Sequence, residues 1–357
     1  MAEKRKIKVV LLFGGRSAEH EVSIVSACSV HKNLDRTKYI PSCIYINKQG
    51  FWRKTESPFL PKTELEKGPF LSFMPWENDK ACFSLDADIY FPILHGPCGE
   101  DGTIQGLFEM ADVPYVGASV LASSIGMDKA VTKSLFQEKK LPVVKYFALC
   151  EPMWKEDPDK ILARIQEDIT FPFFVKPANL GSSVGISKVT EEKQIKVAIR
   201  KAFQYDAKIL IEQGIQGREI ECSVLGNTHP EASLPGEIIP FRDFYDYKDK
   251  YIEGKTSFKI PAEIPRYTAE KVQDMAVAAF QAIGASGMAR VDFFLQEGTQ
   301  KLFLNEINTI PGFTEISMYP KLWEISGLPY PQLLDKLITL GLERHQNKKR
   351  GGVIFKP

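Results

Sequence analysis

The sequence predicts an α/β fold that opens with a doubly wound parallel-sheet domain, and three observations support this prediction. Residues 7–13 form an apolar run, interrupted only by Lys8, that ends in two glycines, which is typical of a parallel strand buried on both faces. Ile24, Ala27 and Cys28 then follow at the i, i+3, i+4 spacing of one helix face. Further strand and helix patterns alternate along the chain, an order that indicates a parallel sheet with helices on its faces.

Each later element is predicted by its own pattern. In the first domain we expect strands over residues 39–46, 88–94 and 113–117, and a helix over 105–111. The stretch 48–76, rich in Pro, Lys and Glu, predicts a surface excursion. Further along we expect helices over 128–139, 191–205, 268–283 and 330–343, and strands over 171–176, 208–213, 289–295 and 301–308. The basic residues 348–350 are expected to lie in a solvated tail.

Length and composition limit what class of protein this is. At about 150 residues per domain, a chain of 357 residues suggests two to three domains. Its 46 Lys and Arg against 45 Asp and Glu argue against a nucleic-acid binder. The longest purely apolar run, residues 275–280, is far shorter than the ~18 residues that span a bilayer. The six cysteines form no C-x-x-C pair, so they suggest neither a zinc site nor a disulfide framework. We therefore expect a cytoplasmic protein that binds neither nucleic acid nor membrane.

Two adjoining predicted strands carry the most informative residues. Because side chains alternate along a strand, Arg290 shares a face with Asp292, and by the same rule Glu306 shares a face with Asn308. A hairpin centred near Thr299 would put Asp292 opposite Glu306, with Arg290 opposite Asn308. Facing carboxylates are destabilising unless a cation lies between them, and two carboxylates with an amide oxygen suit Mg²⁺. Taken alone, the hairpin leaves a second interpretation equally open, in which Arg290 neutralises both acids as a structural ion pair.

A loop rich in glycine and serine, residues 181–185, follows the strand that ends in Lys176. Its glycines and two hydroxyls would let backbone N–H groups wrap phosphate oxygens, with Lys176 on the α- or β-phosphate. The motifs G-x-x-x-x-G-K-[ST] and G-x-G-x-x-G are both absent. A plain surface turn is the commoner interpretation of such a loop by itself. Lys129, similarly, is either a phosphate contact or a solvated helix lysine.

Other candidate contacts lie in loops at the ends of strands and helices. Glu19 follows the first strand, at the edge where α/β folds bind ligands. It can receive an amino group there, or it is a first-turn acid favoured by the helix dipole. His95 binds substrate or only hydrogen-bonds its own loop. The N–H of Gly312 could meet an oxyanion and Ser317 could hold a carboxylate, although a loop with a capping serine is the alternative.

Seven motifs occur in order from Gly14 to Ser317, namely G-G-x-S-x-E-H-E-V-S, H-G-x-x-G-E-D-G, M-D-K, V-K-P-x-x-x-G-S-S-x-G, E-x-x-x-x-G-x-E, R-x-D and E-x-N-T-x-P-G-x-T-x-x-S. Together they closely resemble those of the D-alanine–D-alanine ligases, of the ATP-grasp superfamily. The resemblance implies three α/β domains with ATP between the second and third. We accordingly expect an N-terminal substrate domain at 1–122, a central ATP-grasp subdomain at 123–214 and a C-terminal subdomain at 215–357. The last would carry the metal site and the ω-loop of the family.

The resemblance also implies a reaction and its cofactors. Two D-alanine molecules would be joined to D-alanyl-D-alanine with ATP, through an acyl phosphate, for peptidoglycan precursor synthesis. Two Mg²⁺ (or Mn²⁺) ions would be held by Asp292, Glu306 and Asn308. Five residues match positions that contact ATP: Lys129, Lys176 and Ser183 at the phosphates, and Glu212 and Glu219 at the adenine and ribose.

The remaining matched residues surround the two substrates. Glu19 would receive the ammonium group of the first D-alanine, with His95 nearby. Arg290 and the N–H of Gly312 would stabilise the tetrahedral oxyanion. The carboxylate of the second D-alanine would be held by two residues, Lys250 and Ser317.

Residues 243–251 look like the family's ω-loop, which closes over the acyl phosphate and keeps water away. Tyr251 in this loop matches the residue whose hydroxyl links to Ser182 and Glu19. Relatives that make D-alanyl-D-lactate carry Phe here or a different loop, so Tyr251 favours an amine as second substrate. A D-alanyl-D-serine ligase remains the alternative, with D-alanyl-D-lactate disfavoured. The resemblance further implies a homodimer.

Two other classes are weighed against this interpretation. A different ATP-grasp ligase should lack the trio of Glu19, Ser182 and Tyr251. A nucleotide-binding regulator without catalysis would be expected to lose a metal ligand or Arg290.

Overall fold

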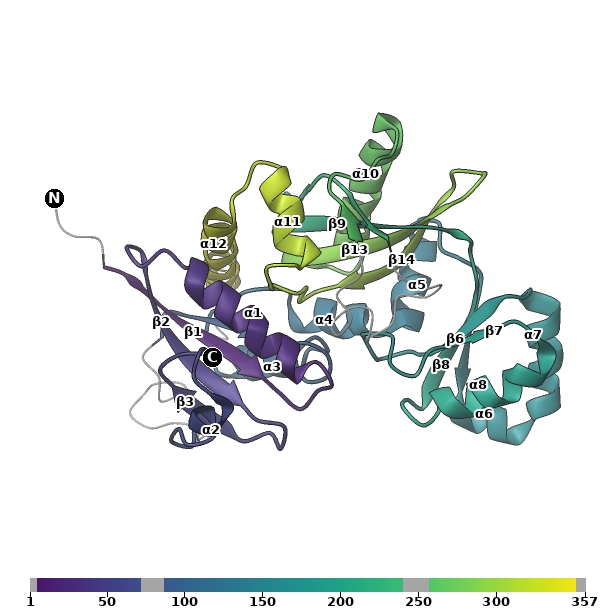
Figure 1. Cartoon of the computed structure of the whole chain (residues 1–357), viewed down its shortest axis with the longest axis horizontal. Helices are drawn as coiled ribbons and strands as arrows, with labels where there is room; N and C mark the ends of the chain where they lie inside the picture. The colour runs from purple at the N-terminus through teal and green to yellow at the C-terminus, as the bar shows by residue number, and fades with distance from the viewer. Residues whose placement is uncertain (1–4, 72–86, 240–256, 351–357) are drawn as a thin grey trace, which may run out of the picture.

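The computed structural model describes residues 5–71, 87–239 and 257–350, which form three sheets arranged side by side (Figure 1). The N-terminal sheet lies at one end of the molecule and the sheet formed by residues 146–213 lies at the other. The sheet formed by residues 217–308 lies between them, so the middle of the sequence is not the middle of the molecule.

The N-terminal sheet has the order β3-β2-β1-β4, with bounds Trp52–Thr55, Tyr39–Ile46, Ile7–Gly14 and Ile89–Ile93. Strand β1 pairs in parallel with β2 and β4. Alternate residues of β1 pack on opposite faces: Val9 and Leu11 lie in one core with helices α1 (His20–Asn33) and α12 (Tyr330–Arg350), and Val10 and Leu12 in another with α3 (Thr103–Met110). Because both faces are covered, the predicted doubly wound parallel sheet is confirmed, with β3 added as an antiparallel edge strand.

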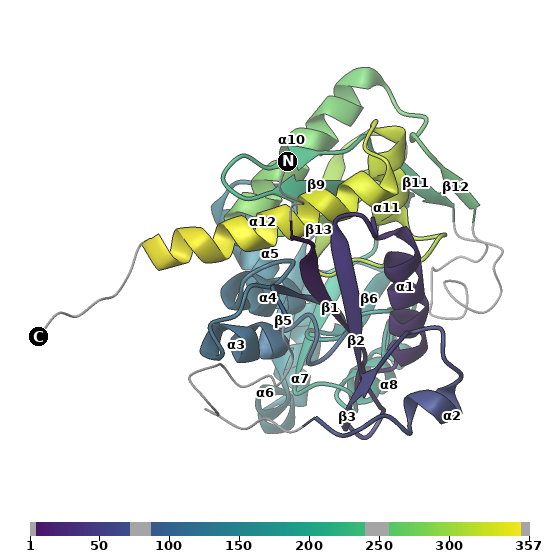
Figure 2. The same cartoon turned by 90° about the vertical axis from the view of Figure 1, so that its left-hand side faces the viewer.

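Three predictions for this region are wrong in part. Residues 113–117 form no strand, because Tyr115 makes only an isolated bridge to Tyr90. The stretch 48–76 is not purely a surface excursion, since its described part contributes β3 and helix α2 (Lys62–Leu65). Residues 348–350 are not a tail: they end helix α12, where Lys348 pairs with Glu109 and Lys349 with Asp112. Apolar residues of α12 pack against the N-terminal sheet, and Figure 2 shows the helix lying across this sheet.

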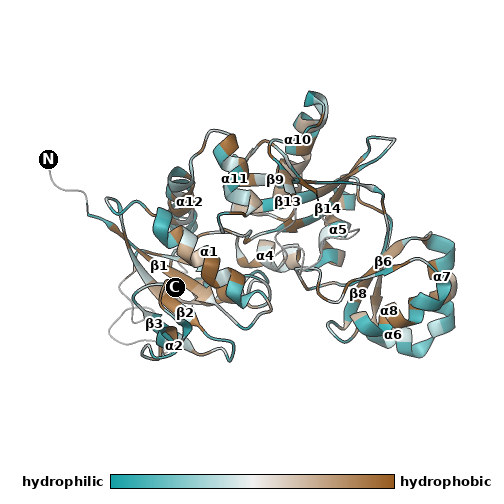
Figure 3. Ribbon diagram, in the orientation of Figure 1, coloured by the Kyte–Doolittle hydropathy of each residue, from teal (hydrophilic) through white to brown (hydrophobic). Residues whose placement is uncertain are grey.

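The second sheet is antiparallel and has the order β5-β8-β6-β7, with bounds Tyr146–Cys150, Lys208–Gln213, Phe173–Pro177 and Ser187–Val189. Helices cover one side of it: α6 (Glu151–Glu156), α7 (Pro158–Asp168) and α8 (Ile195–Ala202), the last preceded by a 3₁₀ turn, Glu192–Gln194. Their apolar residues meet the strands while their polar residues face outward (Figure 3).

The third sheet is built around strands β9 (Gly217–Gly226), β13 (Gly287–Gln296) and β14 (Leu302–Asn308). Three shorter strands complete it: β10 (Glu231–Ala232), β11 (Gly236–Ile239) and β12 (Ser257–Lys259). Val291 and Phe293 of β13 pack with α10 (Arg266–Ala282), so Asp292 between them points to the other face of the sheet. That face carries the polar residues of the next subsection.

Three helices outside this sheet complete the fold: α4 (Val120–Met127), α5 (Lys129–Glu138) and α11 (Met318–Ile325). Ala122 of α4 and Phe136 of α5 lie in the core of the third sheet. Within the described ranges, the structure contains no helix that combines the length and the apolar character needed to span a bilayer.

Gly14 ends β1 at a point where only glycine fits. Its φ is +93°, and a Cβ there would lie 2.1 Å from the carbonyl oxygen of Ile46. Gly327 has a similar φ of +89°, but a Cβ on it would meet nothing within 4 Å, which makes it a matched control.

We expect Gly14→Ala to lower the free energy of unfolding by at least ~2 kcal/mol more than Gly327→Ala, because only Gly14→Ala adds a steric clash to the left-handed strain. Urea denaturation followed by circular dichroism measures both variants. Equal losses would mean that the backbone angle alone, and not the contact with Ile46, sets the cost.

Candidate functional site

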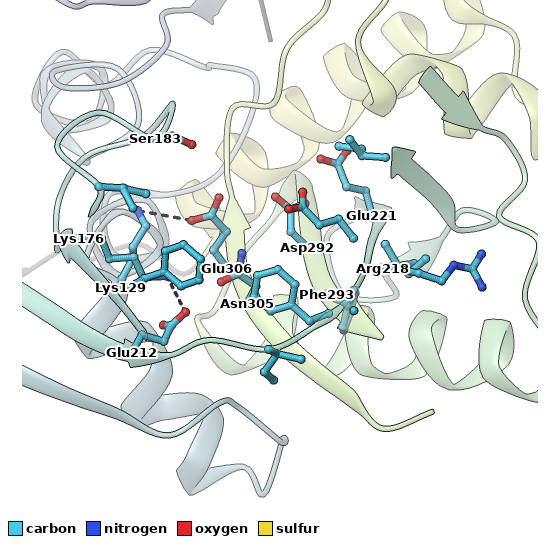
Figure 4. A pocket seen from close by; sticks show the side chains of 18 of the residues that line it. Lys129, Lys176, Ser183, Glu212, Arg218, Glu221, Asp292, Phe293, Asn305 and Glu306 are labelled. Carbon is cyan, nitrogen blue, oxygen red and sulfur yellow. Dashed lines mark hydrogen bonds and ion pairs between the residues drawn. The ribbon is translucent and has the colours of Figure 1, made fainter. Parts of the chain in front are cut away.

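One cavity of about 340 Å³ lies between the second and third sheets (Figure 4). Several predicted site residues line it, namely Lys129, Lys176, Ser182, Ser183, Glu212, Glu219, Asp292 and Glu306. A smaller cavity of about 40 Å³ shares Lys129 and Glu306 with it and adds Asn308. The structure therefore brings the predicted nucleotide and metal residues together around one space.

Strands β13 and β14 place the acids. Asp292 pairs directly with Glu306, and Arg290 with Asn308, so the predicted register is confirmed. Phe293, however, pairs with Leu304, which leaves Asn305 as an extra residue in a β-bulge. Directly opposed residues share a face of the sheet. Without this bulge, Glu306 would lie opposite Val291 and point into the core; with it, Glu306 lies opposite Asp292 and shares its polar face.

Protein cations lie beside these carboxylates. The guanidinium of Arg290 donates two hydrogen bonds of 2.7 Å to Asp292, and its Nε lies 3.1 Å from Glu221. The ammonium of Lys129 lies 3.5 Å from Glu306. The interpretation that Arg290 neutralises both acids of the hairpin thus holds for Asp292, whereas Glu306 has Lys129 as its ion-pair partner. Figure 4 shows the carboxylates of Glu221, Asp292 and Glu306 on the same side of the sheet.

The donor set fits a hard divalent cation. Asp292, Glu306 and Asn308 offer only oxygen atoms, the ligands that Mg²⁺ takes. The Oδ1 of Asn308 accepts a 3.0 Å hydrogen bond from the N–H of Ile310 and keeps a second lone pair. Across the described ranges there is no group of three or more His, Cys, Asp or Glu side chains placed to hold a metal. A Mg²⁺ ion held by two carboxylates and one amide would take its further ligands from water or substrate.

Two lysines on the other side of the cavity contact acids. Lys176, on β6, donates a 2.8 Å hydrogen bond to Glu212 on β8. Lys129 lies at the start of α5, where the Asp128 carboxylate caps the helix, and donates a 2.7 Å hydrogen bond to the carbonyl of Leu180. Burial would raise the pKa of Glu212, but its lysine partners outweigh burial and lower that pKa. Glu212 is thus held as a buried carboxylate.

The loop 181–185 has an uncommon backbone. Ser182 and Ser183 have φ of 50° and 58°, in the left-handed region that non-glycine residues rarely adopt. Such strain persists where surrounding structure imposes it, often at ligand sites. The hydroxyl of Ser182 donates a hydrogen bond to the carboxylate of Glu19. This bond joins the loop 181–185 to the N-terminus of α1.

Glu19 lies at the N-terminus of α1 without capping it through its side chain. The next residue, His20, is buried and forms a chain of polar contacts. Its Nδ1 lies 2.8 Å from the carbonyl of Gly15, and its Nε2 3.2 Å from the hydroxyl of Tyr45. That hydroxyl donates in turn to Glu66, which follows helix α2. The region 48–71 therefore supports the loop that carries Glu19.

His95 is buried beside a carboxylate that sequence reasoning missed. Its Nδ1 lies 3.6 Å from Glu100 and 3.1 Å from the carbonyl of Ile310, and its Nε2 lies 3.2 Å from Ser26. Burial opposes the charged imidazole, yet the Glu100 carboxylate beside it outweighs burial and raises the pKa of His95. Burial, with the charge of Glu19 added, raises the pKa of Glu100.

Gly312 and Ser317 lie together in the loop before α11. A Cβ on Gly312 would lie 2.6 Å from the hydroxyl of Ser317. Ser317 takes the N-cap position but makes no side-chain cap; its hydroxyl accepts a 3.0 Å bond from the N–H of Thr314. The capping alternative is therefore wrong. Lys250 and Tyr251, in the predicted ω-loop, lie outside the described residues.

Four further residues at the site were missed: Glu100, Lys133, Glu221 and Asn305. Glu100 has a signal in the motif that holds His95. Lys133 has one in its spacing, because two lysines at i, i+4 repel unless an acid lies near. Glu221 alternates with Glu219 along a strand and so shares its face. The buried Oδ1 of Asn305 has no hydrogen-bond partner in the described part of the chain. Only recognition of the β-bulge would have predicted that Asn305 lies at the site.

We expect Glu100→Gln to lower the pKa of His95, because the variant removes the charge that raises it. An NMR titration of the imidazole measures this shift. Asp101→Asn is the matched control, because it neutralises the neighbouring acid, whose carboxylate accepts hydrogen bonds from the N–H groups of Cys98 and Thr103. The pKa of His95 should change less in this control than in Glu100→Gln. An unchanged or higher pKa of His95 in Glu100→Gln would rule out the coupling.

Comparisons with known proteins agree over nearly the whole chain. Family models described as "D-ala D-ala ligase N-terminus" and "D-ala D-ala ligase C-terminus" match residues 8–118 and 135–339. A D-alanine–D-alanine ligase of Solibacter usitatus is 47% identical, over 96% of this chain and 98% of its own.

Solved structures share the fold. The D-alanine-D-alanine ligase from Coxiella burnetii superposes with a TM-score of 0.87 at 38% identity, covering 97% of each chain. The VanG D-Ala:D-Ser ligase from Enterococcus faecalis gives a TM-score of 0.80 at 34% identity, covering 94% of this chain and 100% of its own. With the family models matching both halves of the sequence, this chain belongs to the D-alanine–D-alanine ligase family and has its ATP-grasp fold.

Proposed function

We propose that this protein joins two D-alanine molecules to D-alanyl-D-alanine with ATP, for peptidoglycan precursor synthesis. The observation that carries the proposal is the shared cavity in which two lysines, the strained serine loop and the paired acids meet. It is supported by membership of the family along both halves of the chain.

The nucleotide would lie in this cavity. Lys129, Lys176 and Ser183 are assigned to its phosphates, and Glu212 and Glu219 to the adenine and ribose. Asp292, Glu306 and Asn308 would hold Mg²⁺ or Mn²⁺, as two ions, which when bound neutralise charge on the phosphates. Because Lys176 lies on the second sheet and the paired acids lie on the third, with Lys129 beside Glu306, a polyanion with its metal ions could be contacted from both sheets.

The first step forms an acyl phosphate. An oxygen of the first D-alanine carboxylate attacks the γ-phosphorus, and the bond to the ADP oxygen breaks. Glu19, whose carboxylate is oriented by Ser182, is assigned to the ammonium of this substrate, with His95 near it. Phosphorylation is needed because a free carboxylate is a poor acylating agent.

The second step forms the peptide bond. The amine of the second D-alanine attacks the acyl carbon and loses a proton, and phosphate leaves. Arg290 and the N–H of Gly312 are assigned to the oxyanion of this step. Ser317 and Lys250 would hold the carboxylate of the second substrate, and Tyr251 would join Ser182 and Glu19 to close the site.

The division of labour follows the proposed domains. Residues 1–122 would supply the first substrate loop, 123–214 the phosphate loop and 215–357 the metal site. Helices α5 and α12 pack across this division, α5 on the third sheet and α12 on the N-terminal sheet. A cytoplasmic homodimer is the proposed state of the protein.

Incubation of the purified protein with ATP, Mg²⁺ and D-alanine tests the function, with product masses as the measurement. D-alanyl-D-alanine together with equimolar ADP is the expected result. Parallel reactions with added D-serine or D-lactate test the alternatives: a mixed dipeptide or depsipeptide as main product would reassign the second substrate. Phosphate release without any dipeptide would reject the proposal.

Arg290→Ala should lower kcat by about 10²- to 10³-fold, because an oxyanion contact exists only in the transition state. The Kd of ADP, measured by calorimetry, should change less than about fivefold. Arg218→Ala is the control, since Arg218 makes an equally close bidentate contact, at 2.6 Å, to Glu237 in the wall of the same cavity. Weaker nucleotide binding with an unchanged kcat would remove Arg290 from the oxyanion role.

Glu306→Gln should reduce Mg²⁺-dependent turnover by at least ~10²-fold, since a neutral amide is a weaker ligand than a carboxylate. Mn²⁺ binding followed by electron paramagnetic resonance gives a readout independent of turnover and should weaken in parallel. Glu297→Gln, on the exposed turn of the same hairpin, is the control. Wild-type Mn²⁺ affinity in Glu306→Gln would exclude this residue from the metal site.

A further inference from the structure

Lys133 is a fully buried lysine for which the proposed mechanism has no task. It lies on α5, one helical turn after Lys129, and its side chain is 0% exposed. Unlike Lys129 and Lys176, it does not line the cavity. Burial of an ammonium group is costly unless an anion lies beside it, so the identity of its partner matters.

That partner is Glu212, the acid assigned to adenine. The ammonium of Lys133 lies 3.0 Å from Oε2 of Glu212, while Lys176 donates a 2.8 Å hydrogen bond to Oε1. One carboxylate therefore contacts two lysines, one through each oxygen (Figure 4 shows the contact with Lys176). Only Lys176 faces the cavity, so it is the lysine that can turn to a ligand there.

The contact with Glu212 competes with the phosphate contact assigned to Lys176. If Lys176 were the sole counter-ion of Glu212, its transfer to a phosphate would leave a buried carboxylate unpaired, which is strongly destabilising. With Lys133 in place, Glu212 keeps an ion pair after Lys176 has turned away. The two lysines also repel each other across the carboxylate, which weakens the hold on Lys176.

We propose that Lys133 is a positioning residue that keeps Glu212 paired so that Lys176 can pass from this acid to the phosphates of the nucleotide. This inference rests on the proposed function for the identity of the ligand. It gives Lys133 a role in binding polyphosphate, although the residue lies too deep to touch it.

Metal-free tripolyphosphate is the probe that isolates this role, because it has phosphates but no adenine for Glu212 to contact. Its Kd, measured by calorimetry on the whole protein, should be about 10- to 100-fold weaker in Lys133→Met than in the wild type. Adenosine affinity should change less than about threefold. Lys139→Met, an exposed lysine at the end of the same helix, should leave both affinities unchanged.

A double variant separates this role from a merely structural one. In Lys133→Met with Glu212→Gln, neither buried charge remains and Lys176 is not held by an anion. Tripolyphosphate affinity should therefore return to within about threefold of the wild type.

Three results would overturn the inference: wild-type tripolyphosphate affinity in Lys133→Met, equal losses for tripolyphosphate and adenosine, or no recovery in the double variant. None of these binding measurements depends on turnover. Failure of the wild type to form a dipeptide would instead reject the proposed function. The role of Lys133 would still be decided by the affinities for tripolyphosphate and adenosine.

Discussion

Three carboxylates on one face of three adjacent strands oblige the protein to place cations beside them. Glu221 on β9, Asp292 on β13 and Glu306 on β14 lie on the same side of the sheet, where like charges repel. Arg290 and Lys129 lie against them and offset two of the three negative charges. Both cations also have proposed roles toward the reactants. A bound metal ion would take over the neutralisation of the acids, and Arg290 and Lys129 would then be available to contact the oxyanion and the phosphates.

The same compensation appears on the opposite wall, with the signs reversed. There Lys133 and Lys176 share one acid, Glu212, and the cluster carries an excess positive charge where the acid cluster carries an excess negative charge. A bound metal and a polyphosphate are the ligands that would neutralise the two clusters together. Binding of either alone would leave the other wall uncompensated, which gives a physical reason for the two to bind as a complex.

The register of the hairpin could be predicted because the acids and the strand period lie in the sequence, but the bulge that produces this register was missed. Its signal is local: apolar residues follow every second position at Leu302 and Leu304, and the next comes three positions later at Ile307. Lys133 and Glu100 were missed for a different reason. The lysine spacing and the motif around His95 mark them in the sequence, but only the fold determines that Lys133 is buried with Glu212 and that Glu100 is buried with His95. Tertiary packing likewise decides that the basic end of α12 is helical, because its acids come from residues 109–112.

Segments far apart in sequence are joined at the bond between Ser182 and Glu19. Ser182 belongs to the loop assigned to phosphates and Glu19 to the loop assigned to the first substrate, and 163 positions separate them. The residue after Glu19, His20, is held by polar contacts that run from its ring to Tyr45 and from Tyr45 to Glu66. A ligand that orders the serine loop must therefore also restrain the Glu19 carboxylate. The proposed attack on the γ-phosphorus needs both reactants held at once. The hydrogen bond between the two loops would therefore link nucleotide binding to the orientation of Glu19, the acid assigned to the ammonium group of the first substrate.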